Sequence, residues 1–311
     1  MILDNLSRIF IYFDPRLSVY WDKITPCCVD YLPLSLGRYY LDFKCKYFYK
    51  KFDQSGIPIY KARIQKYHPT VICQYALGAY ELLYHSNFQE KNLLMIYLNQ
   101  ADWLLKNSND IGNASGWKFH FDVNEYNLKK PWYSALTQGE AISVLLRAHV
   151  LSNKHEYLDK ALSALNLFEL SVIEGGILNY FNDTPIYEEY PSVKTNCALN
   201  GLIFGVFGLY DFILFNNNEK AVSLFNDGIK SIKKLLPIFD TGFWTLYNLY
   251  ESPELVLASC RYHLLHIEQL KALYYITGDL IFFQYEKKWK DYSSKLRYRL
   301  NALIKKIMNK K

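Results

Sequence analysis

TNCALNGLIFGVFGLYDFIL, residues 195–214, is apolar on nearly every face when it is wound as a helix. Such a helix belongs inside a protein, because none of its sides is suited to water. Three other stretches share this character: TVICQYALGAYELLYH at 70–85, SALTQGEAISVLLRAHVL at 134–151 and ASCRYHLLHIEQLKALYYIT at 258–277. The sequence therefore predicts four buried helices.

Each buried helix is followed by a segment with one charged face, which predicts an outer helix. These segments are 89–107, 155–172, 218–235 and 280–309. The alternation predicts a mainly α fold, an incomplete α/α toroid of about four helical hairpins. Connections from inner to outer helix are short, whereas those from outer to inner helix are long. All long connections should meet on one rim, where we expect the functional site.

The residues before 67 have a different pattern. Segments 39–43 and 57–64 favour extended structure and are joined through a turn at 53–56, so we expect a small N-terminal β-hairpin or sheet region. We expect residues 1–66 to pack on the toroid formed by residues 67–311. Two more short strands are expected inside the long connections, at 176–180 and 243–247.

The charge distribution indicates the class of partner. The chain of 311 residues has 36 Lys and Arg against 30 Asp and Glu, a net charge of +6. The positive residues are scattered, so the concentrated basic patch of a nucleic-acid-binding protein is missing. The balance favours an acidic small molecule or polymer. The chain holds 28 Tyr against 19 Phe, and tyrosine suits a sugar-binding cleft because its ring packs on a pyranose while its hydroxyl hydrogen-bonds.

The six cysteines show neither a CxxC pair nor the spacing of a zinc site, and they are interpreted as free thiols. Reduced cysteines agree with a reducing compartment. No apolar run reaches the length of a membrane span, and residues 1–13 lack a signal-peptide pattern. We therefore expect a cytoplasmic protein without stable membrane insertion.

Two distant segments hold the candidate chemistry. Residues 187–191 read YEEYP, and in an extended stretch only one of Glu188 and Glu189 would face a pocket. In the buried helix at 258–277, Tyr262, His266 and Gln269 share a face. Ordinary structural hydrogen bonds are an equally good explanation of that polar stripe.

His263 and His266 form an HxxH pair in the same helix. No nearby motif supplies a third ligand, so we expect no metal. A hydrogen-bonding or positioning role is favoured for both histidines.

Taken together, these motifs resemble the D-glucuronyl C5-epimerase family, which inverts carbon 5 of glucuronate in heparosan-type or heparan-type chains. The resemblance covers about residues 56–292 and is weak before them. The matching stretches are Pro69 to Leu77, Trp132-Tyr133-Ser134-Ala135 with Gln138-Gly139, residues 187–191, Leu199-Asn200-Gly201, Gly208 to Asp211, 235–242 (LLPIFDTG), Tyr247-Asn248-Leu249, Tyr262-His263, His266-Ile267 and Gln269-Leu270.

The resemblance implies a β-rich N-terminal part on an α/α toroid, no cofactor, an acidic glucuronate-containing polysaccharide as substrate, and a homodimer. By motif it implies catalytic roles for Glu189, Tyr190, Tyr247 and Tyr262. Glu189 and Tyr262 are interpreted as the opposed acid/base pair. Substrate contacts are expected from Asn200, Gln74, Tyr133, Arg261, His263 and His266.

The chain departs from the family pattern at two positions, where Tyr250 replaces an arginine and Arg261 replaces an aspartate. The segment between Tyr247 and Tyr262 is also shorter, and the family's Pro-Asn reads Pro253-Glu254. We expect Arg261 to take over from the lost cation. A uronate polysaccharide lyase and a non-catalytic glycan-binding protein of the same fold are the alternatives.

Overall fold

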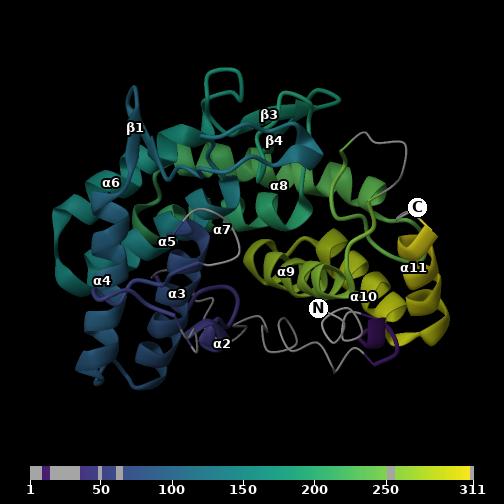
Figure 1. The fold of residues 1–311 in the computed structure, drawn as a ribbon, viewed down its shortest axis with the longest axis horizontal. Coiled ribbons are helices and arrows are strands. Elements are labelled where there is room, and N and C mark those ends of the chain that lie inside the picture. The colour runs from purple at the N-terminus through teal and green to yellow at the C-terminus, as the bar shows by residue number, and fades with distance from the viewer. Residues whose placement is uncertain (1–8, 15–35, 48–50, 61–65, 251–255, 309–311) are drawn as a thin grey trace.

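The structure is a computed structural model that describes residues 9–14, 36–47, 51–60, 66–250 and 256–308. Figure 1 shows a series of helical hairpins that follow one another from α3 and α4 in blue to α9 and α10 in yellow. The small β-hairpins lie together along one side of this series. The architecture is mainly α, as predicted.

The four predicted hairpins are present. They are α3 (Pro69–His85) with α4 (Lys91–Lys106), α5 (Ala135–Ser152) with α6 (His155–Leu165), α7 (Leu199–Asn216) with α8 (Glu219–Phe239), and α9 (Cys260–Thr277) with α10 (Leu280–Ser294). The first helix of each pair is mostly buried, whereas α6 and α8 bury one face only. The predicted outer helix at 280–309 is divided, because Lys295 separates α10 from α11 (Leu296–Met308).

The connections have the predicted asymmetry. Three inner helices end on a residue in the left-handed conformation, namely Asn153, Asn217 and Gly278, and the outer helix begins directly afterwards. Two long connections carry antiparallel pairs. They are β1 (Asn109–Ile111) with β2 (Ala114–Gly116), and β3 (Leu178–Phe181) with β4 (Thr184–Tyr187). Short 3-10 helices η2 (Asn124–Tyr126) and η3 (Asn166–Phe168) complete them.

The strand expected at 176–180 is confirmed as β3. The one expected at 243–247 forms only single bridges, from Asp240 to Thr245 and from Leu246 to Leu257. In this third connection Trp244 is fully buried and its indole nitrogen donates to the Ala258 carbonyl at 3.0 Å. The burial of Trp244 and backbone hydrogen bonds, such as that from Tyr247 N to the Val256 carbonyl at 2.7 Å, together fix the segment without a full strand.

Helices α5 and α7 cross closely at two glycines. A Cβ on Gly139 would lie 2.2 Å from the Phe204 carbonyl oxygen, and one on Gly208 would lie 2.4 Å from the Gly139 oxygen. Real Cβ atoms do not approach so closely, so a side chain at either position would push the helices apart. The glycines of the 195–214 stretch thus act in helix packing, as their spacing predicts.

The structure confirms the predicted turn at 53–56, across which Asp53 N donates to the Ile57 carbonyl at 3.0 Å, whereas residues 39–43 form no strand. Within the described residues before 66, the pairing is limited to isolated contacts such as the Phe52–Pro58 bridge, and residues 44–47 form the short helix α2 (Lys44–Tyr47). Tyr39, Tyr40 and Phe43 are instead buried in the same core as the helices. Aromatic packing decides their structure. Residues 61–64 of the predicted strand lie outside the described residues, and the boundary at residue 66 stays a prediction.

A buried ion pair ties this N-terminal segment to the inner helices. The Arg147 guanidinium on α5 donates to the Asp211 carboxylate on α7 at 2.6 Å, and the Tyr40 hydroxyl donates to the same carboxylate at 2.7 Å. Arg147 also donates to the Gly37 carbonyl at 3.1 Å. Because buried charges are stable only when they are fully paired, residues 37–40 are held firmly against α5 and α7. The same anchoring positions α2.

Helix α7 is, among the described residues, long and apolar enough to cross a membrane by length and composition. Within its most apolar window, 72% of the residues are buried inside the protein. This degree of burial is typical of a helix in the centre of a protein core.

Candidate functional site

A cavity of about 330 Å³ lies where the four inner helices begin. Its lining includes Gln74 of α3, Leu136 of α5, Asn200 of α7 and Tyr262 of α9, each within the first two turns of its helix. The long connections lead into these helix starts, so the cavity occupies the predicted rim. Helix N-termini carry partial positive charge, and four of them facing one cavity favour an anionic ligand.

Glu189 reaches this cavity from the residues after β4. Its Oε2 accepts a hydrogen bond from Asn200 Nδ2 at 2.9 Å. A Cβ on Gly201 would lie 2.4 Å from the Glu189 Cβ and 2.6 Å from Oε2, so only glycine leaves room for this carboxylate. Burial raises the Glu189 pKa to about 7, the range in which a carboxylate works as a general base at neutral pH.

The neighbouring Glu188 has a structural role. Its carboxylate accepts hydrogen bonds from the backbone nitrogens of Asn196 and Cys197, both at 2.8 Å. These bonds hold residues 196–197 outside the helix, and α7 starts at Leu199 and not at the predicted residue 195. The chain bends directly after Glu188, so that Glu189 and Tyr190 both face the cavity whereas Glu188 faces the protein.

Three tyrosines surround Glu189. The Tyr190 hydroxyl hydrogen-bonds to the Glu189 carboxylate, and Tyr247 hydrogen-bonds to Tyr190 in turn. The rings of Tyr247 and Tyr262 meet edge to face with centroids 4.8 Å apart. Burial raises the pKa of Tyr190 and of Tyr247 well above the usual value for tyrosine. Both hydroxyls are therefore protonated donors at neutral pH.

Aromatic side chains form another wall of the cavity. Phe119 and Trp132 are stacked with centroids 4.4 Å apart, and Trp132 lies 5.6 Å from Tyr190. Tyr126 continues the cluster at 5.2 Å from Tyr190. Faces of this kind pack well on the apolar side of a sugar ring.

A lysine, Lys46 of α2, also lines the cavity, and the sequence patterns gave no sign of it. Burial lowers its pKa to about 8, which leaves it mostly charged at neutral pH. Gln74 Nε2 donates to Glu140 Oε1 at 2.9 Å, and burial raises the Glu140 pKa to about 8. The nearby Glu140 is thus mostly protonated at pH 7, and Lys46 supplies positive charge to a cavity that also holds Glu189.

Arg261 is not among the residues that line the cavity, and its predicted substrate contact stays a prediction. It follows Cys260 at the start of α9, and its charge acts on that thiol, lowering a pKa that burial raises. The adjacent Tyr262 does face the cavity. Neighbouring residues on a helix point about 100° apart, so both cannot face the same space.

His263 and His266 are also absent from the cavity lining. The Thr245 hydroxyl lies 3.0 Å from His263 Nδ1 and 3.2 Å from His266 Nδ1, and His263 Nε2 donates to the Trp289 carbonyl at 3.0 Å. Burial lowers the pKa of both imidazoles to about 3, so they are neutral. His263 joins α9 to α10 through the Trp289 carbonyl, and the predicted substrate contact of the two histidines stays a prediction.

The predicted residues Tyr247 and Tyr133 are likewise outside the cavity lining. The Tyr133 ring packs so closely against Gly116 that a Cβ there would lie 2.6 Å from Tyr133 Cδ1. The preceding residue, Trp132, faces the cavity in its place. The motif correctly locates this segment at the cavity. Because side chains alternate along an extended segment, Trp132 faces the cavity and Tyr133 faces away from it.

One cluster of side chains in the described part of the chain has the composition of a metal site. Asp42, Glu81 and His85 hold ligand atoms within 4.8 Å of one another. Arg38 Nε donates to Glu81 at 2.7 Å, and Lys44 Nζ pairs with Asp42 at 2.9 Å. The two carboxylates are therefore already neutralised by protein cations.

Comparisons with known proteins agree with these features. A family model described as the D-glucuronyl C5-epimerase C-terminus matches residues 111–291, more than half of the chain. A D-glucuronyl C5-epimerase of Caenorhabditis elegans is 35% identical over 214 residues, which cover 62% of this chain and 34% of that protein. An uncharacterized protein of Methanocaldococcus jannaschii is 34% identical over 181 residues, 56% of this chain and 57% of that protein.

The fold itself has a counterpart among solved structures. The cellobiose 2-epimerase from Spirochaeta thermophila, an α/α toroid enzyme, matches with a TM-score of 0.50 at 11% identity, covering 71% of this chain and 57% of that chain. This match confirms the predicted fold class. The chain spans about a third of the length of the Caenorhabditis elegans protein and somewhat more than half of the length of the Methanocaldococcus jannaschii protein.

Proposed function

The chain belongs to the family of D-glucuronyl C5-epimerase C-terminal regions, and from this premise we propose that it inverts carbon 5 of glucuronate residues in an acidic, heparosan-like polysaccharide, giving iduronate. The observation that supports this best is the Glu189 carboxylate, which has a pKa of about 7 and lies in a tyrosine-lined cavity. The reaction needs no cofactor, since it consists of proton removal and proton return.

The chemistry requires groups on both faces of the sugar ring. The hydrogen on carbon 5 is α to a carboxylate, and its removal leaves a dianionic enolate. In our proposal Glu189 takes this proton and Tyr262 delivers one from the opposite face. Tyr190, which lines the cavity, turns its protonated hydroxyl from Glu189 to the developing charge, and Tyr247, which lies outside the lining, supports Tyr190 through their hydrogen bond.

Lys46 takes the place of the missing family arginine. It is a cation lining the cavity, and residue 250, where the arginine is expected, is a tyrosine that packs on Tyr126 at 5.3 Å. We assign Lys46 to the sugar carboxylate, whose negative charge it neutralises before the proton leaves. The starts of the four inner helices add to the same positive potential.

Asn200 holds Glu189 in position and has a second function in our proposal. Its Nδ2 donates to Glu189, whereas its buried Oδ1 has no hydrogen-bond partner among the described residues. A buried acceptor without a donor is costly, so a sugar hydroxyl that reaches it is bound favourably. This geometry suits a polyhydroxylated substrate.

Deuterium incorporation tests the proposal. The protein is incubated with heparosan and other glucuronate polymers in deuterated water, and carbon 5 is examined by NMR. We expect deuterium at carbon 5 together with iduronate, and about a thousandfold slower formation of both with the Glu189→Gln variant. A panel of polymers without any exchange would overturn the proposal, and ultraviolet absorbance from an unsaturated uronate would identify a lyase instead. The predicted homodimer and cytoplasmic location stay predictions.

A further inference from the structure

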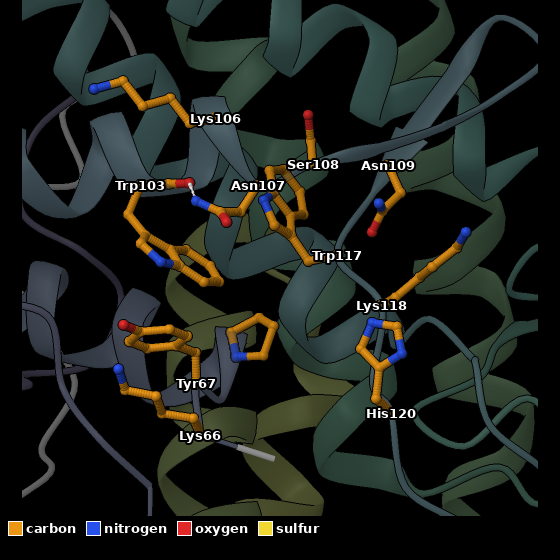
Figure 2. Close-up of a pocket in the computed structure, with 11 residues that line it drawn as sticks. Lys66, Tyr67, Trp103, Lys106, Asn107, Ser108, Asn109, Trp117, Lys118 and His120 are labelled. Carbon is orange, nitrogen blue, oxygen red and sulfur yellow. Dashed lines mark hydrogen bonds between the residues drawn. The ribbon is translucent and has the colours of Figure 1, made fainter.

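A second cavity, of about 390 Å³, lies beside the first and has no role in the proposed reaction. It is formed by the residues before α3, the end of α4, the start of β1 and the segment 117–120. Figure 2 shows the rings of Tyr67, Trp103 and Trp117 close together, with the lysines around them. The lysines that line it are Lys66, Lys106 and Lys118.

The lining has the chemistry of an acidic-sugar site. It combines aromatic rings, three cations and the polar side chains of Asn107, Ser108 and Asn109, and it includes no carboxylate among the described residues. An acidic residue outside the lining, Asp53, accepts a hydrogen bond from the hydroxyl of the lining residue Tyr67 at 2.7 Å. Aromatic faces bind pyranose rings, and lysines bind carboxylate or sulfate groups.

Part of the aromatic surface is available for stacking, and the Lys66 ammonium lies over the Tyr67 ring, 4.9 Å from its centroid. Tyr67 and Trp103 are half-buried, with ring centroids 5.7 Å apart. Trp117 is buried, and its indole nitrogen donates to the Leu104 carbonyl at 2.9 Å. The buried Trp117 therefore supports this group of aromatic rings from the protein interior, while Tyr67 and Trp103 keep exposed surface for a ligand.

The two cavities share one wall. Along the segment 66–70, Tyr67 and Pro69 line the second cavity, whereas His68 and Thr70 line the first. The segment 117–121 alternates in the same way, with His120 on one side and Phe119 and Phe121 on the other. The two cavities thus lie on opposite sides of a wall one backbone layer thick, and a polymer that occupies both must run over the edge of this wall.

We propose that the second cavity binds another acidic sugar residue of the polysaccharide whose glucuronate occupies the first cavity. This inference rests on the proposed function. The second cavity acts in binding only, so it gives the protein a preference for long chains over short ones. It also places substrate recognition partly outside the region 111–291 that matches the family model, since Lys66, Tyr67, Trp103 and Lys106 precede it.

The test is a comparison of two triple variants. The first is Lys66→Gln, Lys106→Gln and Lys118→Gln. The second, a control with the same charge change, replaces Lys91, Lys230 and Lys234, which are exposed and line neither cavity. Carbon 5 exchange is measured with long heparosan and with the shortest heparosan oligosaccharide that the unmodified protein accepts, at low and at high salt.

For the first variant we expect KM for the long polymer to rise about tenfold, the combined effect of three exposed ion pairs, with kcat unchanged. KM for the short oligosaccharide should stay the same, and the salt dependence of polymer KM should weaken. The control variant should change neither value by more than about twofold. Equal effects from the two variants, or equal effects on long and short substrates, would overturn the second binding site.

A second measurement distinguishes failure of the proposed epimerase function from failure of the second binding site. If the unmodified protein exchanges no polymer, heparosan binding is measured directly by tryptophan fluorescence. Loss of binding in the first variant but not in the control then supports the acidic-sugar site by itself. Equal binding by all three proteins, or no binding by the unmodified protein, rejects it.

Discussion

The Glu189 cavity and the histidine pair of α9 are both buried clusters of titratable groups, and both contain a buried side-chain atom that lacks a partner among the described residues. They differ in what they face. Glu189, Tyr190 and Asn200 line an open cavity, whereas His263 and His266 are packed between Thr245 and Trp289. Burial shifts the pKa in both clusters. The comparison teaches that a shifted pKa marks a functional site only where a substrate can reach the group.

The largest effect is expected from Glu189→Gln. The amide keeps the size of the side chain and an oxygen for the Asn200 hydrogen bond, but it cannot accept the proton from carbon 5. We expect kcat for carbon 5 exchange to fall by a factor of about 10³, within the range for loss of a general base. The measurement is deuterium incorporation, and activity within tenfold of the unmodified protein would contradict the assignment.

The same substitution should stabilise the fold at high pH. Burial raises the folded-state pKa of Glu189 from 4.5 to about 7, so the unmodified protein loses stability as pH rises through that window. Glu189→Gln removes this loss, and its free energy of unfolding should exceed that of the unmodified protein by up to about 3 kcal/mol at pH 8. The gain should shrink towards pH 5, as measured by urea denaturation at both pH values.

Gly201→Ala should have the next largest effect. Its Cβ would meet the Glu189 side chain at 2.4 Å and displace the carboxylate. A displacement of about 1 Å can lower the rate about a hundredfold. Gly205→Ala, in the same helix, is the control, because its Cβ meets nothing closer than 3.3 Å. Similar activity of the two variants would show that the position of Glu189 is not critical.

Lys46→Met and Arg261→Met separate the two candidates for the missing cation. Loss of a charged partner of the sugar carboxylate should lower kcat/KM by about tenfold to a hundredfold for Lys46→Met. Arg261 lies outside the cavity lining, and its substitution should change kcat/KM by less than about twofold. The reverse order would reinstate the assignment made from the sequence.

His263→Leu should affect stability and leave the chemistry intact. The substitution removes the bonds to Thr245 and to the Trp289 carbonyl, and the carbonyl loses its side-chain partner whereas Thr245 keeps only the longer contact with His266, at 3.2 Å. We expect the free energy of unfolding to fall by about 1–3 kcal/mol, while kcat of the folded protein changes little. A loss of kcat as large as that of Gly201→Ala would move the histidines into the site.

The helices could be predicted because their signal is repeated along the chain. Four apolar stretches, each followed by an amphipathic one, define the hairpins, and the lengths of the connections locate the rim. Glu189 and Asn200 were found through motifs on that rim. Their mutual hydrogen bond, and the dependence of Glu189 on Gly201, follow from contacts between segments and have no local pattern.

The errors have a common physical origin. Trp132 and Tyr133 are neighbours, as are Arg261 and Tyr262, and a motif does not say which of two adjacent side chains faces the cavity. Lys46 escaped notice because α2 is a single turn in a region of weak resemblance, held in place by the distant pair of Arg147 and Asp211. Long-range packing of this kind leaves no periodicity in the sequence.

The most direct test of the central claim is the pH dependence of carbon 5 exchange in the unmodified protein. If Glu189 removes the proton, kcat/KM should rise with pH through an apparent pKa of about 7, the value to which burial raises this carboxyl, because only the deprotonated form accepts the proton. The rise should be absent from the residual activity of Glu189→Gln. A profile without this rise in the unmodified protein, or the same rise in both proteins, would contradict the account.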